Sequence, residues 1–173
     1  RRVLFRSVTL IIKSSIFSIT FSLFVIGVIA SIFFKRILWG FLAVIPLSSA
    51  VIINFGFMGY FGIELSHITA LLSSIIIGVG VDFSIHYIAQ FRRLSRTVSA
   101  DKLSREVVDD VGYPIILDAA SNMGFGALLF SAFLPIQYIG GLMVFAMMST
   151  SLGTLTVLAA LAELLKKKLI GRS

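Results

Sequence analysis

The stretch that decides the fold is residues 78–93, "GVGVDFSIHYIAQFRR", in which an aspartate and a histidine interrupt the apolar pattern of a helix. An ionisable side chain at the centre of a bilayer costs about 3 kcal/mol or more, so such residues are rare there and usually face protein or water. Whether Asp82 and His86 lie in a membrane depends on the rest of the chain.

The composition indicates an all-α integral membrane protein. Of the 173 residues, 58% are hydrophobic and 13% are charged, whereas a soluble domain carries roughly 25% charged residues. The net charge of +7 does not point to nucleic acid, because the basic residues stand at the ends of apolar runs, as in the flanks of membrane helices. There is no cysteine and therefore no disulfide or thiolate metal site. The start at Arg1 without Met suggests a piece of a longer protein.

Five apolar runs each approach the roughly 20 residues that a helix needs to cross a bilayer. They predict transmembrane helices at about 11–34, 37–57, 68–91, 113–133 and 139–165, within a membrane region of residues 11–170. Residues 1–10 form a juxtamembrane lead-in, and residues 92–112 form a cytoplasmic linker. In that linker the spacing of Leu103, Val107 and Val111 predicts a short amphipathic helix at the membrane surface.

The basic residues also predict the orientation, since cytoplasmic loops carry an excess of Lys and Arg. With five spans the two termini lie on opposite sides, so we expect the N-terminus outside and the C-terminus in the cytoplasm. The beginning of the chain does not fit this pattern fully, because four basic residues stand on the predicted outer side: Arg1, Arg2 and Arg6 in the lead-in and Lys13 just after it. The predicted cytoplasmic side collects Lys35, Arg36, Arg92, Arg93, Arg96, Lys102, Arg105, Lys166, Lys167, Lys168 and Arg172.

Two consecutive spans each carry a stripe of small and polar residues at i, i+4 spacing, which places them on one helix face. We expect the two stripes to meet or to line one polar cavity, because small residues let helices approach and polar ones bond across the contact. The first stripe is Ser74, Gly78, Asp82, His86 and Gln90, and the second is Pro114, Asp118, Asn122 and Gly126.

The depth of these groups predicts a proton relay. At about 1.5 Å per residue, His86 lies roughly 9 Å from Arg92, and Asp82 lies deeper. Asp118 lies roughly 7–8 Å from Tyr113 and hence near the level of His86. Asp118, His86 and Asp82 would then form a ladder for protons. A buried Asp–His pair that only holds two helices together is the competing interpretation.

The motif resembles the glycine-rich, aspartate-bearing helix of the RND superfamily, in particular its MMPL or hydrophobe/amphiphile efflux-3 branch. Further matches are "FFKR", "AVIP", "GYFGIELSHITALL" and "NMGFGALLFSAFLPIQYIGGL", so the resemblance covers essentially the whole chain. It implies five helices of a half-bundle related to sterol-sensing domains, here from the C-terminal half of a transporter, following a periplasmic porter domain.

The resemblance further implies a proton-driven exporter of lipids or other hydrophobic molecules in a bacterial-type inner membrane. Such a protein is not an enzyme and needs no cofactor besides protons as the coupling ion. Its expected partners are membrane lipids, the hydrophobic substrate, the other half of the transporter with its porter domains, and further copies of itself.

In this family the motif aspartate belongs to the proton relay, a role that falls on Asp82. Some members place a tyrosine directly after it, where this chain has Phe83, so a hydroxyl role would be absent or would pass to His86. The role of Asp118 rests on the depth argument, because the family does not supply an acid there. The supporting set comprises Ser74, Gly78, Gly80, Phe83, Gln90, Ser121, Asn122, Gly126 and Thr154.

Two other functions compete with the exporter. A SecDF-type translocation auxiliary shares the fold and the proton coupling, but its equivalent helix carries a different motif. A sterol-sensing-like or scaffold domain that transports nothing is the second, and the intramembrane acids argue against it.

Overall fold

The computed structural model describes residues 2–64 and 67–170, and the regular elements of this part of the chain are all helical. Five stretches are long and apolar enough to cross a membrane, which confirms the predicted number of spans and makes the protein a multi-pass membrane protein. Arg1 and Arg172, which the orientation argument used, lie outside the described residues. The elements are α1 (Arg2–Phe33), α2 (Ile37–Tyr60), α3 (His67–Leu94), α4 (Ala100–Asn122), the 3₁₀ helix η1 (Met123–Phe130), α5 (Leu134–Gly153), the π-helical η2 (Thr154–Leu158) and α6 (Ala159–Ile170).

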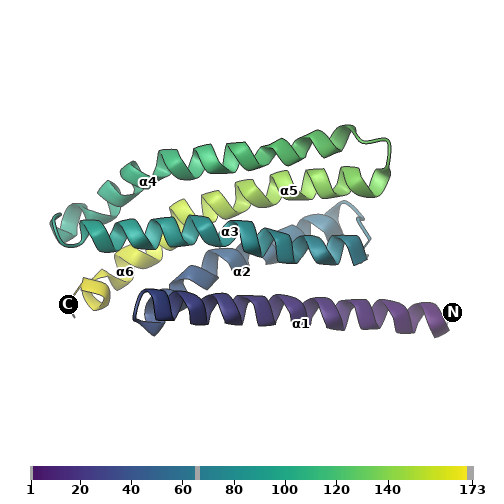
Figure 1. Cartoon of the computed structure of the whole chain (residues 1–173), viewed down its shortest axis with the longest axis horizontal. Helices are drawn as coiled ribbons and strands as arrows, with labels where there is room; N and C mark the ends of the chain where they lie inside the picture. Colours follow the sequence, from purple (N-terminus) through teal and green to yellow (C-terminus); the bar gives the residue numbers. More distant parts are fainter. Residues whose placement is uncertain (1, 65–66, 171–173) are drawn as a thin grey trace.

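The helices run up and down in a bundle, with the two ends of the chain at opposite ends of the bundle (Figure 1). α3 occupies the middle, since it packs against α1, α2, α4 and α5. The motif helix is therefore the one that most of the other helices touch. One face of α3, which carries Asp82 and His86, nevertheless remains uncovered.

Short turns fix the antiparallel order. Between α1 and α2 the chain reverses within three residues, and Lys35 takes up a left-handed backbone conformation with φ of 56°. Gly62, with φ of 64°, follows the end of α2, where glycine is favoured because it has no side chain to clash. Pro135 stands in the first turn of α5, where its missing N–H costs no helical hydrogen bond.

The fourth span begins earlier than the sequence predicted. α4 is one helix from Ala100 and continues through Pro114, so the amphipathic stretch is its first half and not a separate helix at the membrane surface. Leu103, Val107 and Val111 are buried in the main apolar core. The hydropathy pattern missed this because the outer face of the same stretch is charged.

The fifth span also differs from an ideal α-helix. α5, η2 and α6 follow one another without a break, and the apolar stretch runs over Leu134–Lys166. A single π-helical turn inserts one extra residue into an α-helix and frequently occurs at functional sites. Here η2 contacts both α2 and α3.

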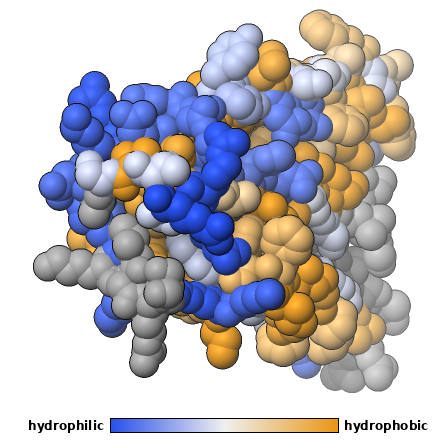
Figure 2. Space-filling view, turned by 60° about the vertical axis from the view of Figure 1, so that its left-hand side comes forward, coloured by the Kyte–Doolittle hydropathy of each residue, from blue (hydrophilic) through white to orange (hydrophobic). Residues whose placement is uncertain are grey.

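The outer surface shows two kinds of chemistry. Large apolar side chains project outward along the spans, for example Phe24 at 68% and Ile32 at 72% exposure, as expected of residues that face lipid. Hydrophilic residues gather at the end of the bundle where α3 ends and α4 begins, which comes forward in the left half of Figure 2. We call it the basic end, because Arg92, Arg93 and Arg96 lie there.

Candidate functional site

The stripe of α3 lies on the exposed face of the helix. Asp82, His86 and Gly78 are all exposed, one helical turn apart from one another. The apolar span that contains them runs over Leu72–Leu94. Asp82 stands 12 residues before Leu94, which is about 18 Å along the axis and near the middle of a bilayer of about 30 Å. Within this chain the acid and the histidine therefore project away from the bundle at mid-span.

The ends of the same stripe are partly covered. Ser74 and Gly78 line a groove of about 270 Å³ against α1, where Ser22 supplies another polar group. A Cβ atom on Gly78 would meet no heavy atom within 4 Å. Gln90, nearer the basic end, is half-buried, and its Nε2 is buried without a hydrogen-bond partner among the described residues.

Asp118 does not lie at the level of His86. α3 and α4 run antiparallel, and five residues join Leu94 to Ala100. His86 is 8 residues from that turn and Asp118 is 18, so they differ by about 15 Å along the axis. The prediction of a shared depth was wrong because it took the fourth helix to begin at Tyr113. Asp118 lies closer in depth to Asp82, at a difference of about 9 Å.

The second stripe makes local bonds and packs against α5. The amide of Asn122 donates to the carbonyl oxygen of Asp118 at 3.0 Å and to its carboxylate at 3.1 Å, just where α4 gives way to η1. Ser121 is exposed. A Cβ on Gly126 would stand 3.2 Å from a methyl of Val144 in α5. Gly126 therefore packs against α5, away from the stripe of α3.

A second polar set lies on the buried side of α3. Two of its members, Gly80 and Thr154, were singled out from the sequence, but Ser84 and Tyr87 were missed. Gly80 lets α3 approach α5 so closely that a Cβ would stand 2.8 Å from a methyl of Thr150. Ser84, Tyr87 and Thr154 are completely buried, and their hydroxyl oxygens have no hydrogen-bond partner among the described residues. The spacing of Gly80 and Ser84, four residues apart, was the available signal.

Phe83 and Thr154 belong to this interior, not to the exposed stripe. Both are 0% exposed, whereas Asp82 is exposed, so the chain does not bring Thr154 to the acid. The aromatic ring after the motif aspartate is thus a core residue here. A tyrosine in its place would carry its hydroxyl into the apolar interior.

One further acid ties two helices together. Glu163 of α6 accepts a hydrogen bond from Ser104 of α4 at 2.5 Å and forms an ion pair with Lys166. Glu163 also lies close enough to Tyr87 to interact with it electrostatically. In the described residues there is no group of three or more His, Cys, Asp or Glu side chains that could hold a metal ion.

Comparison with known protein families identifies the family to which this helical bundle belongs. Residues 32–165 match the sterol-sensing domain of SREBP cleavage-activation. The chain belongs to the sterol-sensing domain family. The matched part of this sterol-sensing domain runs from the end of α1 to α6 and includes both stripes.

A relative from Methanocaldococcus jannaschii, described as a "putative membrane protein", is 28% identical to this chain over 151 residues. The alignment covers 86% of this chain and 39% of the relative. The chain thus spans well under half the length of the curated relative that it matches. The relationship to sterol-sensing domains, inferred from the motif, is confirmed at the level of the family.

Proposed function

We propose that this sterol-sensing domain is the membrane portion of a proton-motive-force-driven exporter of the RND type, of the MMPL branch, which moves lipids or other hydrophobic molecules. The observation that carries the proposal is the exposure of Asp82 and His86 at mid-span. A scaffold helix that faced lipid at this depth would be more stable with apolar residues at these two positions. Asp82 and His86 therefore lower the stability of the helix in lipid, which a purely structural role does not explain.

In this proposal Asp82 takes up and releases the coupling proton. Carboxylates in membrane interiors mark proton relays in pumps and transporters. His86, one turn nearer the basic end, is the second proton carrier, since imidazole changes its charge near neutral pH. Asp118 exchanges no proton directly with His86, because about 15 Å of helix separates their levels.

The exposed stripe of α3 must be covered by protein or water in the assembled transporter, because ionisable side chains at mid-span are not stable in lipid. Another part of the same transporter, its second half, or a further copy of the chain would pack against α3 and enclose Asp82 with water. The polar surface would then lie inside the assembly, away from lipid. The basic end would face the cytoplasm of a bacterial-type cell, following the excess of Lys and Arg, and porter domains outside the membrane would carry the substrate onward.

Replacing Asp82 with Asn tests the proposal in the full-length protein. In proteoliposomes with an imposed pH gradient, movement of a fluorescently labelled phospholipid should fall to the level of empty vesicles, because the amide cannot carry a proton. The control is Asp101→Asn, the same chemical change at an exposed position in the first turn of α4. Transport that persists in the Asp82 variant while both proteins assemble normally would contradict the relay.

A specific observation favours a second function, a domain that binds an apolar ligand without transport. A groove of about 580 Å³ lies between α1 and α2 and is almost entirely apolar. It is lined by Leu23, Phe24, Gly27, Val28, Ser31, Ile32, Ile37, Gly40, Phe41 and Val44. Under this alternative, Asp82→Asn leaves ligand binding unchanged, and no gradient-dependent movement occurs in the parent protein either.

A further inference from the structure

A pocket of about 400 Å³ opens at the basic end of the bundle, away from the stripe of α3. Its wall comes from the α1–α2 turn, the end of α3, the segment after it, and the end of α6. The size is within the range of small-molecule sites. The lining residues are Arg36, Trp39, Phe91, Arg92, Ser95, Arg96 and Leu169.

Three guanidinium groups line this pocket, and none of the described residues in its wall is acidic. Among the described residues, none of Arg36, Arg92 and Arg96 forms an ion pair. The neighbouring Arg93 and Arg105 behave differently, since each pairs with an aspartate of α4. An excess of basic residues at a membrane boundary explains why arginines are present. It does not explain why the unpaired ones share a cavity.

Neighbouring groups hold two of the three arginines in place. The Arg36 guanidinium donates to the carbonyl oxygen of Leu169 at 2.9 Å, one of the last carbonyls of α6, which have no partner within the helix. The Arg92 guanidinium carbon lies 5.5 Å from the centroid of the Phe34 ring, a cation–π distance. A guanidinium has five N–H donors, so both arginines keep donors for a ligand.

Two packed aromatic rings, Ser95 and Leu169 complete the wall. Trp39 and Phe91 are buried and pack edge to face, with ring centroids 5.6 Å apart. The hydroxyl of Ser95 donates to the carbonyl oxygen of Arg92 at 2.9 Å. A small anion would therefore enter a preformed cavity with fixed positive groups, which reduces the entropy lost on binding.

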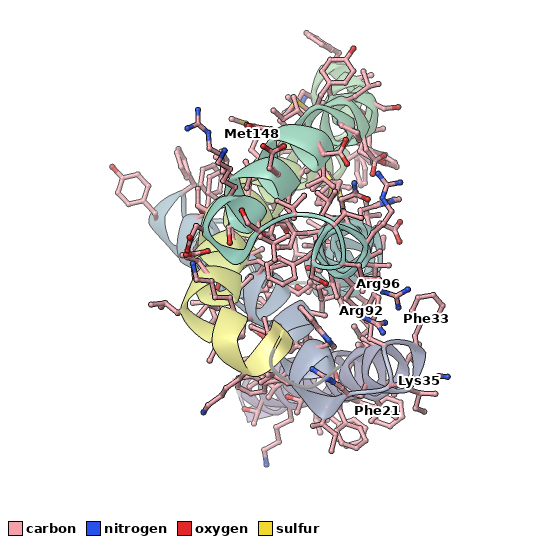
Figure 3. The ribbon with its side chains drawn as sticks, turned by 90° about the vertical axis from the view of Figure 1, so that its left-hand side faces the viewer. Phe21, Phe33, Lys35, Arg92, Arg96 and Met148 are labelled. Carbon is pink, nitrogen blue, oxygen red and sulfur yellow. The ribbon has the colours of Figure 1, made fainter. Side chains whose placement is uncertain are left out.

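We propose that this pocket binds a phosphate group, delivered by the headgroup of an anionic lipid. Guanidinium groups pair with phosphate oxygens through two parallel hydrogen bonds, and basic pockets between membrane helices recognise anionic headgroups. We expect the phosphate to come from a lipid because the pocket lies at the ends of the membrane spans, where lipid headgroups are. Phe33 is 69% and Ile37 is 83% exposed beside Arg36, and they offer an apolar surface for the acyl chains. In Figure 3, Arg92 in the last turn of α3 and Arg96 just after the helix extend toward the side where Phe33 lies.

The test compares two charge-matched double variants of the full-length protein in neutral detergent. Arg92→Gln with Arg96→Gln removes two pocket arginines, whereas Arg93→Gln with Arg105→Gln removes two that are already paired. The probes are dioctanoyl phosphatidylglycerol, the zwitterionic dioctanoyl phosphatidylcholine, and inorganic phosphate. Binding is followed by native mass spectrometry.

The parent protein should bind the anionic lipid at least tenfold more tightly than the zwitterionic one. A surface arginine contributes about a fivefold gain in affinity, so the pocket variant should lose about 25-fold, and the control variant less than about threefold. Inorganic phosphate that competes with the lipid would also support the site and would make the phosphate, not the acyl chains, the main contact.

Equal binding of the two lipids would overturn the proposal, as would an equal loss in both double variants. If the pocket variant does not fold, Arg92→Lys keeps the charge and removes the planar donor pair. Its preference for the anionic lipid should fall several-fold, since a lysine makes a point contact with phosphate. A preference for the anionic lipid that is as strong in the Lys variant as in the parent would likewise reject the site.

Discussion

The crossing of α1 and α2 offers the sharpest test of how the bundle is held together. Gly40 of α2 lies against α1, where a Cβ atom would stand 2.2 Å from the carbonyl oxygen of Gly27 and 2.0 Å from the hydroxyl of Ser31. That hydroxyl already donates to the same carbonyl at 2.6 Å. Gly27 and Ser31 are four residues apart, the small-xxx-small spacing that brings membrane helices close together.

Replacing Gly40 with Ala should destabilise the protein by about 3 kcal/mol, at the upper end of the usual cost of overpacking. Real Cβ contacts lie beyond 3 Å, so α1 and α2 would have to separate by roughly 1 Å. A backbone carbonyl cannot rotate out of the way as a side chain can. The apolar contacts on both sides of the crossing would loosen together, because packed interiors relax only partially.

The control is Gly56→Ala in the same helix, where a Cβ would meet nothing within 4 Å. This variant should be neutral or more stable by up to about 1 kcal/mol, because alanine favours the helix. The free energy of unfolding is measured by titration with SDS in mixed micelles, with the fluorescence of Trp39 as the signal. The close crossing would be refuted if the two variants unfolded within about 1 kcal/mol of each other.

Two more perturbations test other contacts in the bundle. Glu163→Gln should lower the free energy of unfolding by only about 0.5–1 kcal/mol. It weakens the charge-assisted bond from Ser104 that joins α4 to α6, but the Glu163 side chain is 42% exposed. The same SDS titration measures the change, and Glu106→Gln, at an exposed position, should change little. Gly80→Ala should lower the free energy of unfolding by about 1–2 kcal/mol, because the new Cβ meets the methyl of Thr150. The hydroxyl of Thr150 donates to the carbonyl oxygen of Ala146 and holds that side chain in place. A neutral result would show that α3 and α5 separate easily.

The five spans could be predicted from the sequence because each run of apolar residues is long enough to cross a bilayer on its own. The start of α4 could not be predicted in the same way. Its first three turns expose charged residues such as Asp109 and bury Leu103 and Val107, so the average hydropathy is low although the buried face is continuous. Pro114 was no barrier either, since α4 continues through it.

The stripe of α3 shows a second limit of the sequence. Its spacing placed Asp82 and His86 correctly on one face, but periodicity does not tell which face turns inward. We expected the polar face to meet the stripe of α4 or to line one polar cavity with it, and the structure turns it outward. The inward face carries Gly80, which the sequence analysis grouped with the polar stripe, and Ser84, which it did not single out. Which face is buried depends on the neighbours that pack there, and these are known only from the fold.

The contrast between two surfaces of the same bundle explains why the outward acid matters. α1 presents phenylalanines to its surroundings, for example Phe17 and Phe24, and this surface is stable in lipid. α3 presents Asp82 and His86 at mid-span, and that surface is stable only against protein or water. The chemistry of the covering element then determines the role of the acid.

An element that placed a fixed positive charge beside Asp82 would make an ion pair, and Asp82→Asn would then impair assembly. An element that enclosed the acid with water and hydroxyl groups would leave it free to take up a proton. The same substitution would then remove gradient-driven transport and spare assembly. Measuring assembly and transport on one Asp82→Asn sample therefore separates a structural charge from a proton carrier, and the relay requires the second result.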